Sequence, residues 1–166
     1  MAFIDSDEFI WPTCSGASLE DFLKSLDGQM NVGALTLNWS NYGSSRNYFF
    51  QDAPVMQRFS YRAQKNHALN QHIKSIIKLE AFDRFESVHG ANLKSPYRNV
   101  MSDGLDLVEP LENGMMSHSD RVCWDGFRIN HYVIKSWTEY VDRKIRRGRA
   151  VSPNAASNRA WHSATA

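Results

Sequence analysis

Apolar residues recur at helical spacing in two segments of the chain. Between residues 18 and 28, the sequence SLEDFLKSLDG begins with a capping pattern and places leucine and phenylalanine on one face. Between residues 136 and 148, SWTEYVDRKIRRG begins with a second capping box, and Trp137 and Tyr140 would belong to its buried stripe. The pattern therefore predicts two amphipathic helices, the second ending at Gly148.

Runs of β-branched and aromatic residues predict strands between these helices. The clearest runs cover residues 32–39 and 127–133, with further candidates near 55–62, 73–79 and 86–89 and a turn at 102–104. The first apolar run, AFI at 2–4, is typical of a strand buried on both faces of a sheet. A chain seldom begins with such a strand, so we expect the C-terminal part of a larger α/β domain.

The hydrophobic content is sufficient for one folded domain. At 166 residues, with 42% of them hydrophobic, the chain can close a core of its own. From residue 151 onward, serine, alanine and asparagine dominate and the periodicity is lost. We therefore expect a domain over residues 1–150 and a flexible tail over 151–166.

Charge and cysteine content exclude several classes of partner and site. The formal net charge is +1, so no overall field attracts nucleic acid, and nucleic acid is not an expected partner. Cys14 and Cys123 lie far apart without the spacing of a zinc site, which favours reduced, structural thiols and a cytoplasmic location. No stretch approaches the roughly 20 apolar residues that span a bilayer.

The sequence IDSDEF contains a candidate metal site. Side chains at i and i+2 of an extended chain point to the same side, so Asp5 and Asp7 can present two carboxylates to one point. A hard divalent ion such as Mn²⁺ or Mg²⁺ relieves the repulsion between such carboxylates. The alternative is an acidic turn that is simply solvated, and spacing alone does not decide between the two.

The sequence RINHYVIKSW contains a candidate phosphate site. His131 ends a predicted strand, and Lys135 directly precedes the helix that begins after Ser136. An imidazole and an ammonium group beside the positive end of a helix suit a phosphate ligand. The alternative is a core histidine beside a solvated lysine.

Taken together and in order, several motifs resemble GT-A-type glycosyltransferases of the family 2 and family 92 group. They are AFIDSDEFI near the start, LNWSNYGSSRN in mid-chain, QRF after it, and INHYVIKSWTEYVDRKIRRGRA near the end. The loop departs from the common FGSSGH pattern, because Arg46 and Asn47 replace glycine and histidine. The resemblance implies the C-terminal portion of a GT-A fold, with a mixed sheet, flanking helices and no preceding nucleotide-binding strands in this chain.

This resemblance implies a metal-dependent and inverting transfer of sugar from a nucleotide-sugar donor. Asp5, Asp7 and His131 would hold Mn²⁺ or Mg²⁺, and these three with Lys135 would bind the donor diphosphate. The acceptor would be a glycan or a lipid-linked hydroxyl in polysaccharide synthesis, with peripheral membrane association through that acceptor.

Acceptor and base residues follow less directly from the motifs. Candidate acceptor contacts are Trp39, Ser44, Ser45 and Arg58, although for Trp39 core packing is the favoured interpretation. The base that activates the acceptor hydroxyl is unassigned, and its candidates by residue type are Glu80, Asp83, His89 and Asp125.

Two other functions are compatible with the same residues. One is a carbohydrate-binding fragment that keeps the fold without turnover. The other is a metal-dependent phosphohydrolase that uses Asp5, Asp7 and His131.

Overall fold

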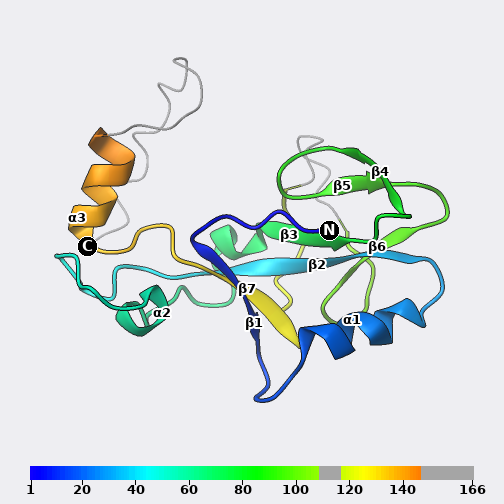
Figure 1. Ribbon diagram of the computed structural model, residues 1–166, viewed down its shortest axis with the longest axis horizontal. Helices are drawn as coiled ribbons and strands as arrows, with labels where there is room; N and C mark the ends of the chain where they lie inside the picture. Colours follow the sequence, from blue (N-terminus) through cyan, green and yellow to red (C-terminus); the bar gives the residue numbers. More distant parts are fainter. Residues whose placement is uncertain (109–116, 147–166) are drawn as a thin grey trace.

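A mixed five-stranded sheet forms the centre of the protein (Figure 1). The computed structural model describes residues 1–108 and 117–146. Strands run in the order β1-β7-β2-β3, and β6 also pairs with β2. Their bounds are β1 Glu8–Pro12, β2 Val32–Asn41, β3 Ile73–Ile77, β6 Arg98–Met101 and β7 Phe127–His131.

The long strand β2 organises this sheet because it has partners along its whole length. Its first half lies between antiparallel β3 and parallel β6. Its second half pairs in parallel with β7, from Trp39↔Ile129 to Asn41↔His131. Strand β1 then pairs with β7 in an antiparallel register that sets Glu8 opposite His131. The acidic turn and the end of β2 are therefore brought to the same end of β7.

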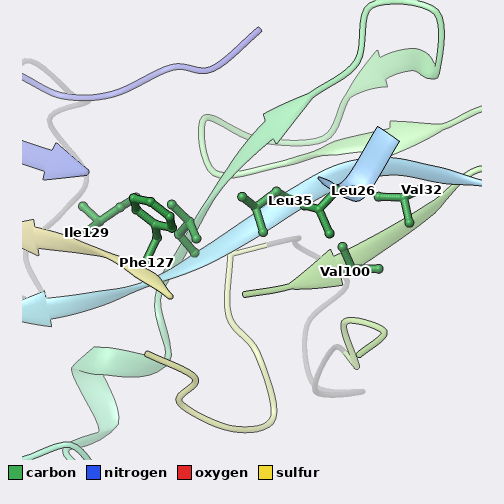
Figure 2. Packing of buried hydrophobic residues seen from close by; sticks show 7 residues of the cluster. Leu26, Val32, Leu35, Val100, Phe127 and Ile129 are labelled. Atoms are coloured by element: carbon green, nitrogen blue, oxygen red, sulfur yellow. The ribbon is translucent and has the colours of Figure 1, made fainter. Parts of the chain in front are cut away.

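Helix α1 (Leu19–Asp27) covers one part of the sheet and closes the main core. Ser18 caps the helix by accepting a hydrogen bond from the backbone N–H of Asp21. Figure 2 shows Leu26 of this helix with residues of the sheet, and the buried cluster comprises Leu26, Val32, Leu35, Leu37, Val100, Phe127 and Ile129. These apolar residues hold β2, β6 and β7 against α1.

Close packing at Gly33 joins the sheet to a small hairpin formed by β4 (Phe82–Phe85) and β5 (Ala91–Leu93). A Cβ atom on Gly33 would lie 2.7 Å from the Cβ of Tyr97 and 2.8 Å from that of Ala81. Glycine is therefore required here by space, because a larger side chain would displace backbone-linked atoms on both sides.

Short helices surround the far end of β2. They are α2 (Val55–Arg58), the 3₁₀ turn η1 (Ala68–Gln71), α3 (Trp137–Tyr140) and the π-helical turn η2 (Val141–Arg146). Figure 1 shows α3 standing at one end of the sheet, on the left. Among the residues that the structure describes, no helix is long and apolar enough to cross a membrane.

Most of the predicted elements are confirmed. Both predicted helices form, one after Ser18 and one after Ser136. So do the turn after Met101 and the strands predicted at 32–39, 73–79 and 127–133. The mixed sheet with flanking helices is confirmed as well. The predicted helix end at Gly148 and the predicted tail lie outside the described residues.

Other local predictions were wrong. Residues 2–4 form no buried strand: Ala2 makes a single bridge to Ile76, and Phe3 is 53% exposed. Residues 55–58 are helical instead of extended, and residues 86–89 form the bend between β4 and β5. Neither Trp137 nor Tyr140 lies in the core as predicted: Trp137 is 51% exposed, and its ring stacks on that of the half-buried Tyr140.

Candidate functional site

The two aspartates of the D-x-D sequence lie in a turn before β1 and not after a strand. The backbone N–H of Glu8 donates to the carbonyl of Asp5, and the backbone N–H of Asp5 donates to the Glu8 carboxylate, both at 3.0 Å. The carbonyl of Asp7 accepts from the N–H of Tyr132, directly after β7. These bonds fix Asp7, which is buried, beside the end of β7 while Asp5 stays exposed.

His131 meets Asp7 at this point, and its neighbours define which ring nitrogen carries the proton. The amide nitrogen of Asn41 donates to the Leu69 carbonyl and to Asn70 Oδ1, so Asn41 Oδ1 is left as an acceptor. It lies 3.0 Å from His131 Nδ1, which therefore donates. The other ring nitrogen, Nε2, lies 4.0 Å from Asp7 Oδ1.

A divalent ion fits between these two groups chemically. Imidazole nitrogen and carboxylate oxygen both bind divalent ions, and the 4.0 Å from His131 Nε2 to Asp7 Oδ1 is no longer than two metal bonds of about 2.0–2.2 Å laid end to end. The hydrogen bond from Nδ1–H to Asn41 is also the kind of support that metal-bound histidines have. His131 and Asp7 are therefore suited to share one ion.

Asp5 faces a different partner. Its carboxylate lies 3.1 Å from the ammonium group of Lys74, a residue of β3 that is only 2% exposed. The same ammonium lies 3.6 Å from the buried carboxylate of Glu8. Burial raises the pKa of Glu8, and Lys74 opposes this effect. Lys74 thus neutralises the outer part of the acidic turn.

Lys135 lies close to Asp7 on a strained backbone. Its φ of 59° is in the left-handed region, which a residue with a Cβ adopts at some cost. Burial lowers the pKa of Lys135, the charge of Arg143 lowers it further, and Asp7 raises it. The structure therefore brings Asp7, His131 and Lys135 together, three of the four residues predicted for the donor site, and turns the fourth, Asp5, toward Lys74.

Trp39 lies at the centre of a group of aromatic rings. Its ring centroid is 4.0 Å from that of His131, 4.5 Å from that of His72 and 5.7 Å from that of His89. Burial, and after it the charges of neighbouring histidines, lower the pKa of His72 to about 4, so this ring is neutral at physiological pH. Trp39 therefore packs against the candidate site and is partly buried there.

The other predicted acceptor contacts lie in the loop that follows β2 and in α2. Ser45 Oγ accepts hydrogen bonds from the backbone N–H groups of Ser60 and Tyr61, and Ser44 accepts from Asn47 through its carbonyl. Arg58 forms two hydrogen bonds to the carboxylate of Glu139, and its side chain is 7% exposed. Ser45 and Arg58 thus shape the loop and anchor α3.

The four base candidates are scattered. Three of them are exposed: Glu80 just before β4, Asp83 within β4, and Asp125 just before β7. His89 is partly buried, and its Nδ1 lies 2.9 Å from the carbonyl of Ile73. Of these four residues, His89 is the one whose ring lies next to Trp39.

A second group of possible metal ligands lies away from this turn. Asp103, Cys123 and Asp125 present ligand atoms within 4.8 Å of one another, the one such group of three among the described residues. The carboxylate of Asp103 already accepts two hydrogen bonds from Arg121 and one from the N–H of Leu105. An ion would have to compete with these bonds, which makes the group a poor candidate.

Sequence patterns missed three residues that define the site. Asn41 orients His131, Lys74 pairs with Asp5, and Arg143 lies 3.1 Å from Asp7. A lysine and an asparagine inside otherwise apolar strands are unusual enough to signal buried partners. Nothing in the run of cations after residue 142 distinguishes Arg143 from its neighbours.

Comparison with known families assigns the chain. The model of Glycosyltransferase family 92 matches residues 1–155, so the chain belongs to this family and is a glycosyltransferase domain. No curated protein matches the chain significantly. The enzyme class predicted from the motifs is therefore confirmed. A sugar donor and an acceptor are its substrates, and neither is identified by family membership.

Proposed function

We propose that this domain transfers a sugar from a nucleotide-sugar donor to a hydroxyl acceptor with the help of Mn²⁺ or Mg²⁺. Asp5, Asp7 and His131 hold the ion, and Lys135 binds the donor diphosphate. The observation that carries the proposal is the meeting of His131 with Asp7 at the end of β7. His131 Nδ1 is held by Asn41 Oδ1 at 3.0 Å, which directs Nε2 to a point 4.0 Å from the Asp7 carboxylate, so a nitrogen and an oxygen that divalent ions accept as ligands face each other.

The proposed chemistry uses charge stabilisation of the leaving group. A bound divalent ion acts as a Lewis acid on the diphosphate oxygens. Lys135 adds a positive charge beside the same site, and its backbone strain is typical of functional positions. Asn41 keeps the His131 ring in place, and Lys74 restrains Asp5 until the ion binds.

The proposed acceptor side is the aromatic surface next to this site. The ring of Trp39 contacts that of His131. The loop after β2 is joined to α3 by two backbone hydrogen bonds, from Trp137 N–H to the Asn47 carbonyl and from Thr138 N–H to the Tyr48 carbonyl. These two segments expose the aromatic rings of Tyr48, Phe49 and Trp137. Aromatic rings pack well against the C–H face of a sugar. Of the base candidates, His89 is favoured because it lies beside Trp39.

Isothermal titration of the domain with a panel of nucleotide-sugars, with and without Mn²⁺, tests this proposal. We expect metal-dependent binding that His131→Ala reduces by shifting the metal concentration required. Lys135→Ala should weaken nucleotide-sugar binding and leave the affinity for Mn²⁺ nearly unchanged. The matched controls His67→Ala and Lys24→Ala remove the same groups at exposed positions and should bind normally.

The outcomes also separate the alternative functions. Binding of a glycan without any nucleotide-sugar would favour a carbohydrate-binding fragment. Release of phosphate without an acceptor would favour a phosphohydrolase. Equal effects of His131→Ala and His67→Ala on metal dependence would refute the proposed role of His131.

A further inference from the structure

Arg143 bonds the Asp7 carboxylate at the candidate metal site. Its guanidinium Nη2 donates to Asp7 Oδ2 at 3.1 Å, while His131 faces Oδ1 of the same carboxylate. The two oxygens of Asp7 are therefore divided between a cationic side chain and a candidate metal ligand. A metal ion that binds Asp7 has to share this carboxylate with Arg143 or displace it.

Among the described residues, no hydrogen-bond partner faces one nitrogen of Arg143. Nη1 is buried and makes no hydrogen bond to any of the described residues. A buried, unsatisfied guanidinium N–H is costly, because it has lost water and gained nothing in return. The missing partner of Nη1 is therefore best supplied by an anion with oxygen acceptors.

A second positive charge lies nearby. Arg143 and Lys135 are close enough for their charges to oppose each other, and Lys135 is held there by a left-handed backbone conformation. With Arg143 bonded to Asp7 and Lys135 within electrostatic range of both, two cations lie near one carboxylate, and this local excess of positive charge suits a dianionic or trianionic ligand. Arg143 belongs to a π-helical turn. This conformation is rare in proteins overall, and where it occurs it is often found at functional sites.

We propose that Arg143 is an exchangeable partner of Asp7. In the metal-free domain Arg143 bonds Asp7, and once a divalent ion has replaced Arg143 at Asp7, Arg143 bonds the donor diphosphate. This inference rests on the proposed function, since it needs a metal at Asp7 and a diphosphate beside it. It adds a residue with two successive roles. Arg143 first neutralises Asp7, and it then supplies a guanidinium, which can bind two phosphate oxygens at once.

Calorimetric titration with Mn²⁺ alone, and then with inorganic pyrophosphate in saturating Mn²⁺, tests this exchange. Pyrophosphate is the probe because it carries the diphosphate without a nucleotide base. Arg143→Ala should bind Mn²⁺ severalfold more tightly than the unmodified domain, because a competing cation is removed from Asp7. The same variant should bind pyrophosphate at least about tenfold more weakly, the loss expected for one charged hydrogen bond.

Two further variants make the result specific. Arg143→Lys keeps the charge and should lose less pyrophosphate affinity than Arg143→Ala. Arg84→Ala removes one positive charge at an exposed site on β4 and should change neither titration. Circular dichroism at the titration temperature identifies any variant that fails to fold, and Arg143→Lys then provides the comparison.

The possible failures are distinguishable. An unmodified domain that binds neither Mn²⁺ nor Mn²⁺-dependent pyrophosphate would refute the proposed function. An unmodified domain that binds both, together with undiminished pyrophosphate binding by Arg143→Ala, would refute the exchange alone. Weaker Mn²⁺ binding by Arg143→Ala would also overturn the exchange, since Arg143 would then support the metal-binding form of Asp7.

Discussion

The anchoring of α3 through Glu139 predicts a specific dependence of stability on pH. Its carboxylate accepts two hydrogen bonds from Arg58 and closes the capping box with Ser136. Burial raises the pKa of Glu139, but the hydrogen bonds from Arg58 and Ser136 outweigh it and lower the pKa from 4.5 to about 2. Replacing Glu139 with glutamine removes this charge and keeps the shape of the side chain.

The size and direction of the effect follow from this shift. Because the pKa is lower in the folded state, the stabilisation is present above pH 4.5 and is lost as the pH falls toward 2. At about 1.4 kcal/mol per unit, the difference between the unmodified domain and Glu139→Gln should be about 3 kcal/mol at pH 7. By the same relation, the difference in unfolding free energy between the unmodified domain and Glu139→Gln should fall to about 2 kcal/mol at pH 3.5.

Urea unfolding at a series of pH values measures this difference. Glu20→Gln is the matched control, because Glu20 pairs with Lys24 on the exposed surface of α1 and should contribute little at any pH. A difference between the unmodified domain and Glu139→Gln that stays constant from pH 7 to pH 3.5 would refute the reasoning. So would a difference no larger than that of Glu20→Gln.

Two other substitutions test the packing. Gly33→Ala should destabilise the domain by at least about 1–3 kcal/mol in urea unfolding, because its Cβ would lie within 3 Å of Tyr97 and Ala81, whereas Gly28→Ala, with 3.8 Å to the nearest atom, should be tolerated. Trp137→Ala should lower the free energy of unfolding by less than about 1 kcal/mol, because the residue is 51% exposed. Trp124→Ala should lower it by about 3–5 kcal/mol, because that residue is 7% exposed. Similar losses for the two tryptophans would contradict the assignment of Trp137 to the surface.

Sequence patterns predicted the elements with the clearest apolar signals. Helix α1 and strand β2 carry strong patterns and clear boundaries, and both form as expected. The apolar run at 2–4 was misleading, because hydrophobic residues are also common on surfaces, and Phe3 is 53% exposed where its ring packs against Phe85. Short elements such as α2 depend on tertiary contacts, which periodicity does not contain.

The candidate site was only partly predictable for a related reason. Asp7, His131 and Lys135 could be identified from motifs that lie far apart in the sequence. Their partners depend on strand order: Asn41 reaches His131 because β2 and β7 pair in parallel. Arg143 reaches Asp7 only through the π-helical turn after α3, and a capping box predicts where a helix begins and not how its later turns are wound.

Mn²⁺ binding by Asp7→Asn tests the central claim most directly. Paramagnetic broadening of the His131 imidazole resonances on addition of Mn²⁺ reports an ion at this histidine, and calorimetry gives its affinity. The account predicts that the unmodified domain binds one ion with broadening at His131, that Asp7→Asn loses both signals, and that the exposed-site control Asp27→Asn keeps them. Retention of full Mn²⁺ affinity and His131 broadening in Asp7→Asn would contradict the account.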